Sequence, residues 1–152
     1  MTAGARVFAV VGLFAAACSA LGCPGRSRER TPPPAADETL VDLGREVGLK
    51  FPADARLLGV SRERGIDDLV RFKIEMGAAD LPGLMASTPI KPDAFEPGER
   101  GLLGPDQGFW DPNRARHLLT GQAVLKNNRA LNIGIADGGP QRVILYIVNH
   151  GT

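Results

Sequence analysis

The sequence contains little sulfur and few aromatic side chains. Its two cysteines, Cys18 and Cys23, both lie near the start of the 152-residue chain. The remainder therefore has no thiol for a disulfide, a thiolate nucleophile or a sulfur-ligated metal. Aromatic residues make up 5% of the chain, which is too few for the stacking platforms that bind single-stranded nucleic acids.

Neither sign of charge is in excess. Lysine and arginine number 18 against 17 acidic residues, so the net charge is +1. This balance produces no overall field that would gather nucleic acid or an anionic membrane, and we expect no nucleic-acid partner. The hydrophobic content of 43% and the charged content of 23% are ordinary for a soluble domain.

The apolar run near the amino terminus is too short for a permanent membrane span. It extends from Val7 to Ala17, about 11 residues, whereas a spanning helix needs roughly 20. Arg6 precedes the run, and small residues follow it to Gly22. This layout predicts a secretory signal peptide over residues 1–22.

Residues 20–23, with the sequence A-L-G-C, resemble the bacterial lipobox, in which a small residue precedes a cysteine that is acylated after cleavage. The resemblance implies that Cys23 is lipidated and that the membrane is a partner; each buried methylene contributes about 0.8 kcal/mol to attachment. Pro24 stands where some bacteria place an aspartate for inner-membrane retention, which favours the outer membrane. Two alternatives stay open, a plain signal peptide cut after Ala17 or Ala20 and an uncleaved anchor.

Residues 23–39 are rich in arginine and proline, including the run Pro32-Pro33-Pro34. Such a segment cannot bury enough apolar surface to order itself, so we expect a disordered tether. Residues 40–152 then form one globular domain, and a domain of about 110 residues can bury a core without disulfides.

Apolar spacing predicts both strands and helices in this domain. Residues 70–76 alternate strictly, which places one face of a strand on a core and the other in water. The preceding stretch should place Leu58 and Val60 inward, and a second hairpin should pair residues 131–135 with 143–148, the latter centrally because it is apolar on both faces. Helical signals appear near residues 40–47 and after Asp80. We therefore predict an α+β fold, an antiparallel sheet of about four strands in two hairpins with one or two helices packed on one face.

A long segment rich in proline and glycine lies between the second helix and the second hairpin. It runs for about twenty residues from Pro89, and loops of that length are commonly functional or mobile. We take it as a candidate contact surface, with Asp106, Phe109, Trp110 and His117 as candidate binding residues. Trp110 has two interpretations, an anchor at an interface or a cover for the edge of the core.

The other polar residues are given ordinary structural roles. Asp67 and Asp68 fit a turn, and the basic residues near them fit a solvated face of the first hairpin. His117 and His150 belong to no metal-binding pair, and no nucleophile motif accompanies them. We expect no metal and no cofactor.

The patterns G-I-D-D-L-V-R-F, D-L-P-G-L-M and V-I-L-Y-I resemble small bacterial lipoproteins and exported proteins whose function is uncharacterised. The resemblance spans about residues 51 to 148 and implies no activity. We expect a binding or interaction module tethered to the cell envelope, such as an inhibitor or immunity-type protein with an envelope protein as partner. One alternative is a small periplasmic hydrolase or metal-dependent enzyme that uses His117 with Asp106 or Asp111. Another is a structural lipoprotein with no discrete ligand.

Overall fold

The computed structural model describes residues 39–65, 68–98 and 100–151. The predicted signal peptide, Cys23 and nearly all of the tether lie outside these residues. Within the described part of the chain, no helix has the length and apolar character needed to cross a bilayer. The elements in chain order are α1 (Leu40–Val47), β1 (Arg56–Glu63), β2 (Leu69–Gly77), η1 (Ala78–Asp80), α2 (Leu81–Ser87), η2 (Pro92–Ala94), β3 (Glu96–Pro97), η3 (Arg100–Leu103), η4 (Pro112–Arg114), β4 (Leu119–Val124), β5 (Arg129–Asp137) and β6 (Arg142–Gly151).

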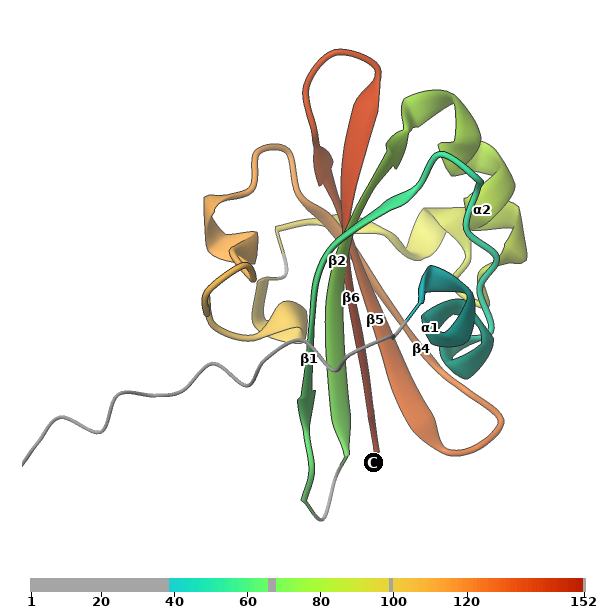
Figure 1. The fold of residues 1–152 in the computed structure, drawn as a ribbon, viewed down its shortest axis with the longest axis vertical. Coiled ribbons are helices and arrows are strands. Elements are labelled where there is room, and N and C mark those ends of the chain that lie inside the picture. Colours follow the sequence, from blue (N-terminus) through green and yellow to red (C-terminus); the bar gives the residue numbers. More distant parts are fainter. Residues whose placement is uncertain (1–38, 66–67, 99, 152) are drawn as a thin grey trace, which may run out of the picture. The chain divides into compact units, whose positions relative to one another are not determined.

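All the described strands form one antiparallel sheet in the order β1-β2-β6-β5-β4-β3. The predicted α+β class and antiparallel sheet are confirmed, but the sheet has six strands instead of about four (Figure 1). Residues 119–124 read L-T-G-Q-A-V, which lacks the alternation that reveals a strand. The two-residue strand β3 is defined only by its pairing with β4.

The carboxyl-terminal strand β6 lies in the middle of the sheet. It pairs with β2 on one side and with β5 on the other over most of its length. Its alternate residues face opposite sides of the sheet, so an apolar sequence on both faces is required, as predicted.

The two helices pack on one face of the sheet. The hydroxyl of Thr39 accepts a hydrogen bond from the Asp42 backbone N–H at 3.2 Å and caps α1, which ends at Gly48 in the left-handed region with φ of 75°. Leu43 and Val47 of α1 and Leu84 of α2 contribute to the larger core, together with the alternate residues 70–76 of β2.

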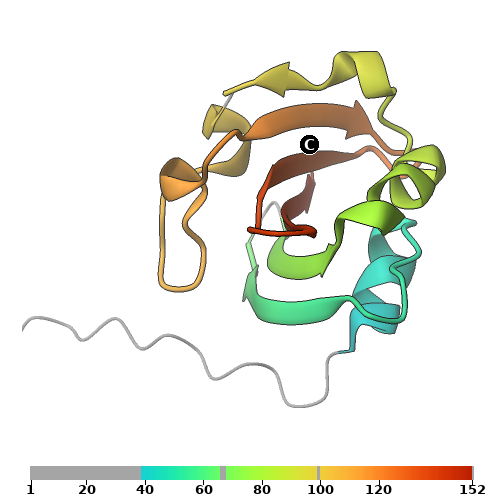
Figure 2. The same cartoon turned by 90° about the horizontal axis from the view of Figure 1, so that it is seen from above.

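The opposite face of the sheet is also covered, which corrects the prediction that it meets water. Residues 100–118 lie across it and bury Leu103, Trp110 and Leu118 in a second core. Figures 1 and 2 show this segment and the helices on opposite sides of the sheet. The side chains of Arg71 and Lys73, expected in solvent, are each only 14% exposed.

The inward residues of β1 also differ from the expected ones. Leu57 and Val60 pack against the larger core, whereas Leu58 is 39% exposed. The register moves from Leu57 opposite Ile74 to Gly59 opposite Lys73, so Leu58 has no partner across the pair. This β-bulge inserts one residue and reverses the alternation, which the sequence pattern did not reveal.

Candidate functional site

The two aromatic candidates from the sequence are packing residues in this conformation. Trp110 is 1% exposed, and its indole N–H donates a hydrogen bond to the Leu103 carbonyl at 3.0 Å. Its ring packs edge to face against the Tyr146 ring, with 5.3 Å between the ring centroids. Phe109 is half-buried against Gly59, where an added Cβ would lie 2.4 Å from the ring. Their role in binding a partner stays a prediction.

The polar candidates do not come together. Asp106 accepts a hydrogen bond from the Asn113 backbone N–H at 2.9 Å. It also forms an ion pair with Arg114, with 3.7 Å between Asp106 Oδ2 and Arg114 Nε. His117 is exposed, with φ of 48°, and among the described residues it makes no hydrogen bond to Asp106 or Asp111. This arrangement gives no support to a general base oriented by a carboxylate.

Asp111 is instead bound to the sheet. Its Oδ1 accepts from Lys73 Nζ at 2.5 Å and from the Tyr146 hydroxyl at 2.8 Å. Partial burial acts to raise the pKa of Asp111, but the hydrogen bonds from Lys73 and Tyr146 and the charge of Lys73 together hold it below its usual value. The carboxylate is therefore charged at neutral pH and fastens residues 100–118 to β2 and β6.

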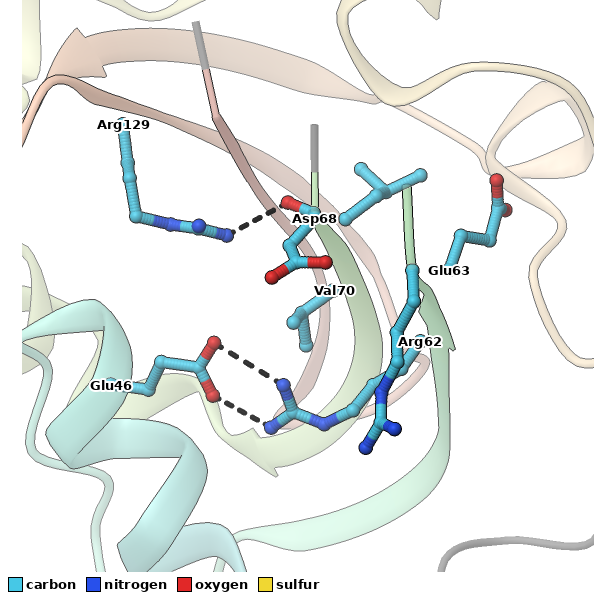
Figure 3. Close-up of a pocket in the computed structure, with 8 residues that line it drawn as sticks. Glu46, Arg62, Glu63, Asp68, Val70 and Arg129 are labelled. Carbon is cyan, nitrogen blue, oxygen red and sulfur yellow. Dashed lines mark hydrogen bonds and ion pairs between the residues drawn. The ribbon is translucent and has the colours of Figure 1, made fainter. Parts of the chain in front are cut away.

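A pocket rich in charge lies beside α1, at the end of the sheet where β1 turns into β2 (Figure 3). We call it the charged pocket, and its volume is about 280 Å³. Three arginines and three acidic residues line it together with two apolar residues. The lining residues are Glu46, Arg62, Glu63, Arg64, Asp68, Leu69, Val70 and Arg129.

Two of the arginines are held in place. Arg62 forms a bidentate ion pair with the carboxylate of Glu46 in α1, with N···O distances of 2.6 and 3.3 Å. Arg129 donates from Nε to the side-chain oxygen of Asn149 at 2.9 Å and from Nη2 to the backbone carbonyl of Asp68 at 2.9 Å. Planar guanidinium groups fixed in this way are already oriented for a ligand.

Other polar groups of the charged pocket remain available. Figure 3 shows the carboxylate of Asp68 directed between Arg129 and the Glu46–Arg62 pair, and this carboxylate has no ion-pair partner among the described residues. A guanidinium has five N–H donors, and the hydrogen bonds of Arg129 to described residues use only Nε and Nη2. The Nη1 donors are therefore free within the described structure.

A buried donor lies next to the floor of the charged pocket. Asn149 is 0% exposed, and its Nδ2 has no hydrogen-bond partner in the described structure. Asn149 pairs across the sheet with Val70, which lines the pocket, so the two side chains share a face. Buried polar groups are nearly always satisfied, so a donor without a partner beside a lining residue of the pocket is unusual.

Sequence reasoning did not identify this pocket. Its residues come from α1, the β1–β2 hairpin and β5, and no local motif connects Glu46 with Arg129. The only signals were Asp68 and the nearby arginines, which also fit a turn and a solvated surface. No cluster of three or more histidine, cysteine or acidic residues suited to a metal occurs in the described part of the chain.

Comparisons with protein-family models, with curated proteins and with solved structures found no match to this chain.

Proposed function

We propose that this chain is an exported, lipid-anchored binding domain that takes a small zwitterionic group into the charged pocket. The signal-like segment and the lipobox-like residues before Cys23 support the anchor. The pocket supports the binding role, because part of its charge is compensated within the protein and part is not. The observation on which the proposal chiefly rests is the Asp68 carboxylate beside the fixed Arg129, since this carboxylate has no ion-pair partner within residues 39–65, 68–98 and 100–151.

The ligand class follows from these groups. Asp68 supplies an anionic acceptor for an ammonium group, while Arg129 Nη1 and Arg64 supply donors for a carboxylate. A small ligand that carries both an ammonium and a carboxylate meets both requirements, and an α-amino acid is the simplest such ligand. A pocket of 280 Å³ suits a ligand of amino-acid size better than one of drug size, for which pockets range from about 300 to 1,000 Å³.

The same chemistry can come from two sources. One is a free amino acid, and the other is an amino-acid end that remains zwitterionic on a larger molecule, such as an envelope protein or peptide. The second source would make the domain an interaction module of the inhibitor or immunity type.

Titration of the full chain with small probes tests the ligand class. Backbone amide NMR shifts of Asp68, Val70 and Arg129 would be followed with glycine, with glycinamide, which keeps only the ammonium, and with acetate, which keeps only the carboxylate. The amide shift changes should reach saturation as glycine is added. The other two should bind about tenfold more weakly or worse, because each loses a charge-assisted hydrogen bond worth about 1.5–3 kcal/mol. The dipeptide γ-glutamylglycine, whose zwitterionic end is carried on a larger molecule, distinguishes the two sources.

Two variants complete this experiment. Asp68→Asn should weaken glycine binding about tenfold, whereas Asp93→Asn, an exposed acid in η2, should bind as the parent chain does. No saturable binding of glycine or γ-glutamylglycine, or equal binding to Asp68→Asn, would reject the ligand class. The intact mass of the same preparation tests the anchor, since an acylated chain beginning at Cys23 is expected and an unmodified cysteine contradicts it.

A further inference from the structure

A second hollow runs along the outer side of α1, and we call it the α1 groove. Its volume is about 690 Å³, and most of its lining is apolar. Among the residues that the structure describes, its charged lining residues are Arg45 and Lys50, and both are cationic. The full lining is Leu40, Val41, Gly44, Arg45, Gly48, Leu49, Lys50, Phe51, Pro52, Ala53 and Ala55.

The α1 groove is bordered by an exposed apolar side chain. Leu43 and Val47 of the helix are buried in the larger core, but Val41 is 69% exposed. A single exposed valine is ordinary on a protein surface. Here it stands at the rim of an apolar hollow on the first turn of the helix, so both form one apolar surface.

Lys50 supplies the unpaired positive charge of this surface. Arg45 is partly compensated, because it forms an ion pair with Asp42 at 3.1 Å. Lys50 is exposed and has no ion-pair partner among the described residues. An apolar surface beside an uncompensated cation matches the boundary of an anionic bilayer, where acyl chains lie below negatively charged headgroups.

The position of the α1 groove in the chain also favours a bilayer. The helix begins directly after the tether, and Cys23 precedes Thr39 by only 16 residues. At about 3.1 Å per residue for a Pro-rich segment, the tether is long enough for α1 to reach the surface that holds the acyl chains. The structure therefore assigns to the chain a second membrane contact, which rests on the anchor of the proposed function: the α1 groove docks on an anionic bilayer, with Val41 in the headgroup region and Lys50 on the phosphates.

Matched cysteine labels test this contact. Val41→Cys and Val124→Cys place a label on α1 or on β4 at positions whose parent side chains are 69% and 67% exposed. The chain has no other cysteine after residue 23, and acylation would block that thiol. Each labelled full chain, purified from the membrane fraction, would be reconstituted into phosphatidylcholine vesicles with or without phosphatidylglycerol. Quenching of the fluorophore by acrylamide, a neutral aqueous quencher, is the readout.

The label at residue 41 should be quenched several-fold less than the label at residue 124 on vesicles that contain phosphatidylglycerol. Adding Lys50→Glu should remove most of that difference without changing the circular dichroism spectrum. Equal quenching at the two positions on anionic vesicles would overturn the docking. So would protection of residue 41 in detergent without vesicles, because the groove would then be filled by the chain itself or by a second copy.

The intact mass of each preparation separates this inference from the proposed anchor. If the chain is acylated and residue 41 is quenched freely, the anchor stands and the docking fails. If the chain is not acylated, Cys18 and Cys23 are replaced by serine so that only residue 41 or 124 carries the label, and the chain is mixed with an excess of the same anionic vesicles. Protection of residue 41 then supports docking without an anchor, and free quenching rejects both.

Discussion

Replacing Trp110 tests whether the second core stabilises the domain. Trp110→Ala removes a fully buried ring, its edge-to-face contact with Tyr146 and the hydrogen bond to the Leu103 carbonyl. Truncation of a buried tryptophan typically costs about 3–5 kcal/mol. Trp110→Phe keeps most of the ring but leaves the carbonyl without its donor, which costs about 1–3 kcal/mol. The order of stability should be parent, then phenylalanine, then alanine.

The measurement is urea unfolding followed by far-UV circular dichroism, because tryptophan fluorescence is lost in both variants. A domain of this size has a total stability of about 5–15 kcal/mol, so the alanine variant should lose a large fraction of it. Val124→Ala, which changes an exposed residue, is the control and should stay within about 0.5 kcal/mol of the parent. An alanine variant equally close to the parent would refute the packing argument and restore Trp110 as a candidate for partner binding.

Two further predictions concern the contacts that hold residues 100–118 on the sheet. Gly59→Ala should lower the free energy of unfolding in urea by about 1–3 kcal/mol, because its Cβ would lie 2.4 Å from the Phe109 ring. Phe109→Ala should destabilise the Gly59→Ala variant less than it destabilises the parent, and additive effects of the two substitutions would contradict this contact. The second prediction concerns Asp111, whose pKa is lower in the folded state than in the unfolded state. The hydrogen bonds that Asp111 accepts from Lys73 and Tyr146 therefore stabilise the domain at pH values above the unfolded pKa, which is near 4. This stabilisation is lost as the pH falls through the pKa that Asp111 has in the folded state. Asp111→Asn should therefore reduce the loss of urea stability between about pH 5 and pH 2, and an unchanged pH profile would contradict this role.

The elements that sequence reasoning predicted are those with strong local patterns. The strict alternation of residues 70–76 and the turn between β5 and β6 are local properties, and both predict the observed strands. Strand β4 has no such signal, because Gly121 occurs where Ile90 and Phe95 pack closely against the sheet. The need for a glycine there depends on residues about thirty positions away, and single-sequence patterns do not contain that information.

The candidate site was less predictable than the fold. The charged pocket depends on Glu46 of α1 reaching Arg62, and on Arg129 reaching the carbonyl of Asp68, over long separations in the chain. Arginine and acidic residues are also the common residues of solvated surfaces, so their type alone did not distinguish a site. The length of the segment after Pro89 predicted a contact surface. Its apolar residues Ile90 and Leu103 are instead buried in the two cores.

The central place of β6 affects when the domain can fold. The β1–β2 hairpin joins β5 only through β6, so the sheet stays in two parts until residues 142–151 are present. Pairing β2 with β6 also brings together residues far apart in the chain, and such contacts form slowly. On a nascent chain, the complete sheet therefore cannot form until residues 142–151 have emerged from the ribosome, however early the β1–β2 hairpin and the helices are made.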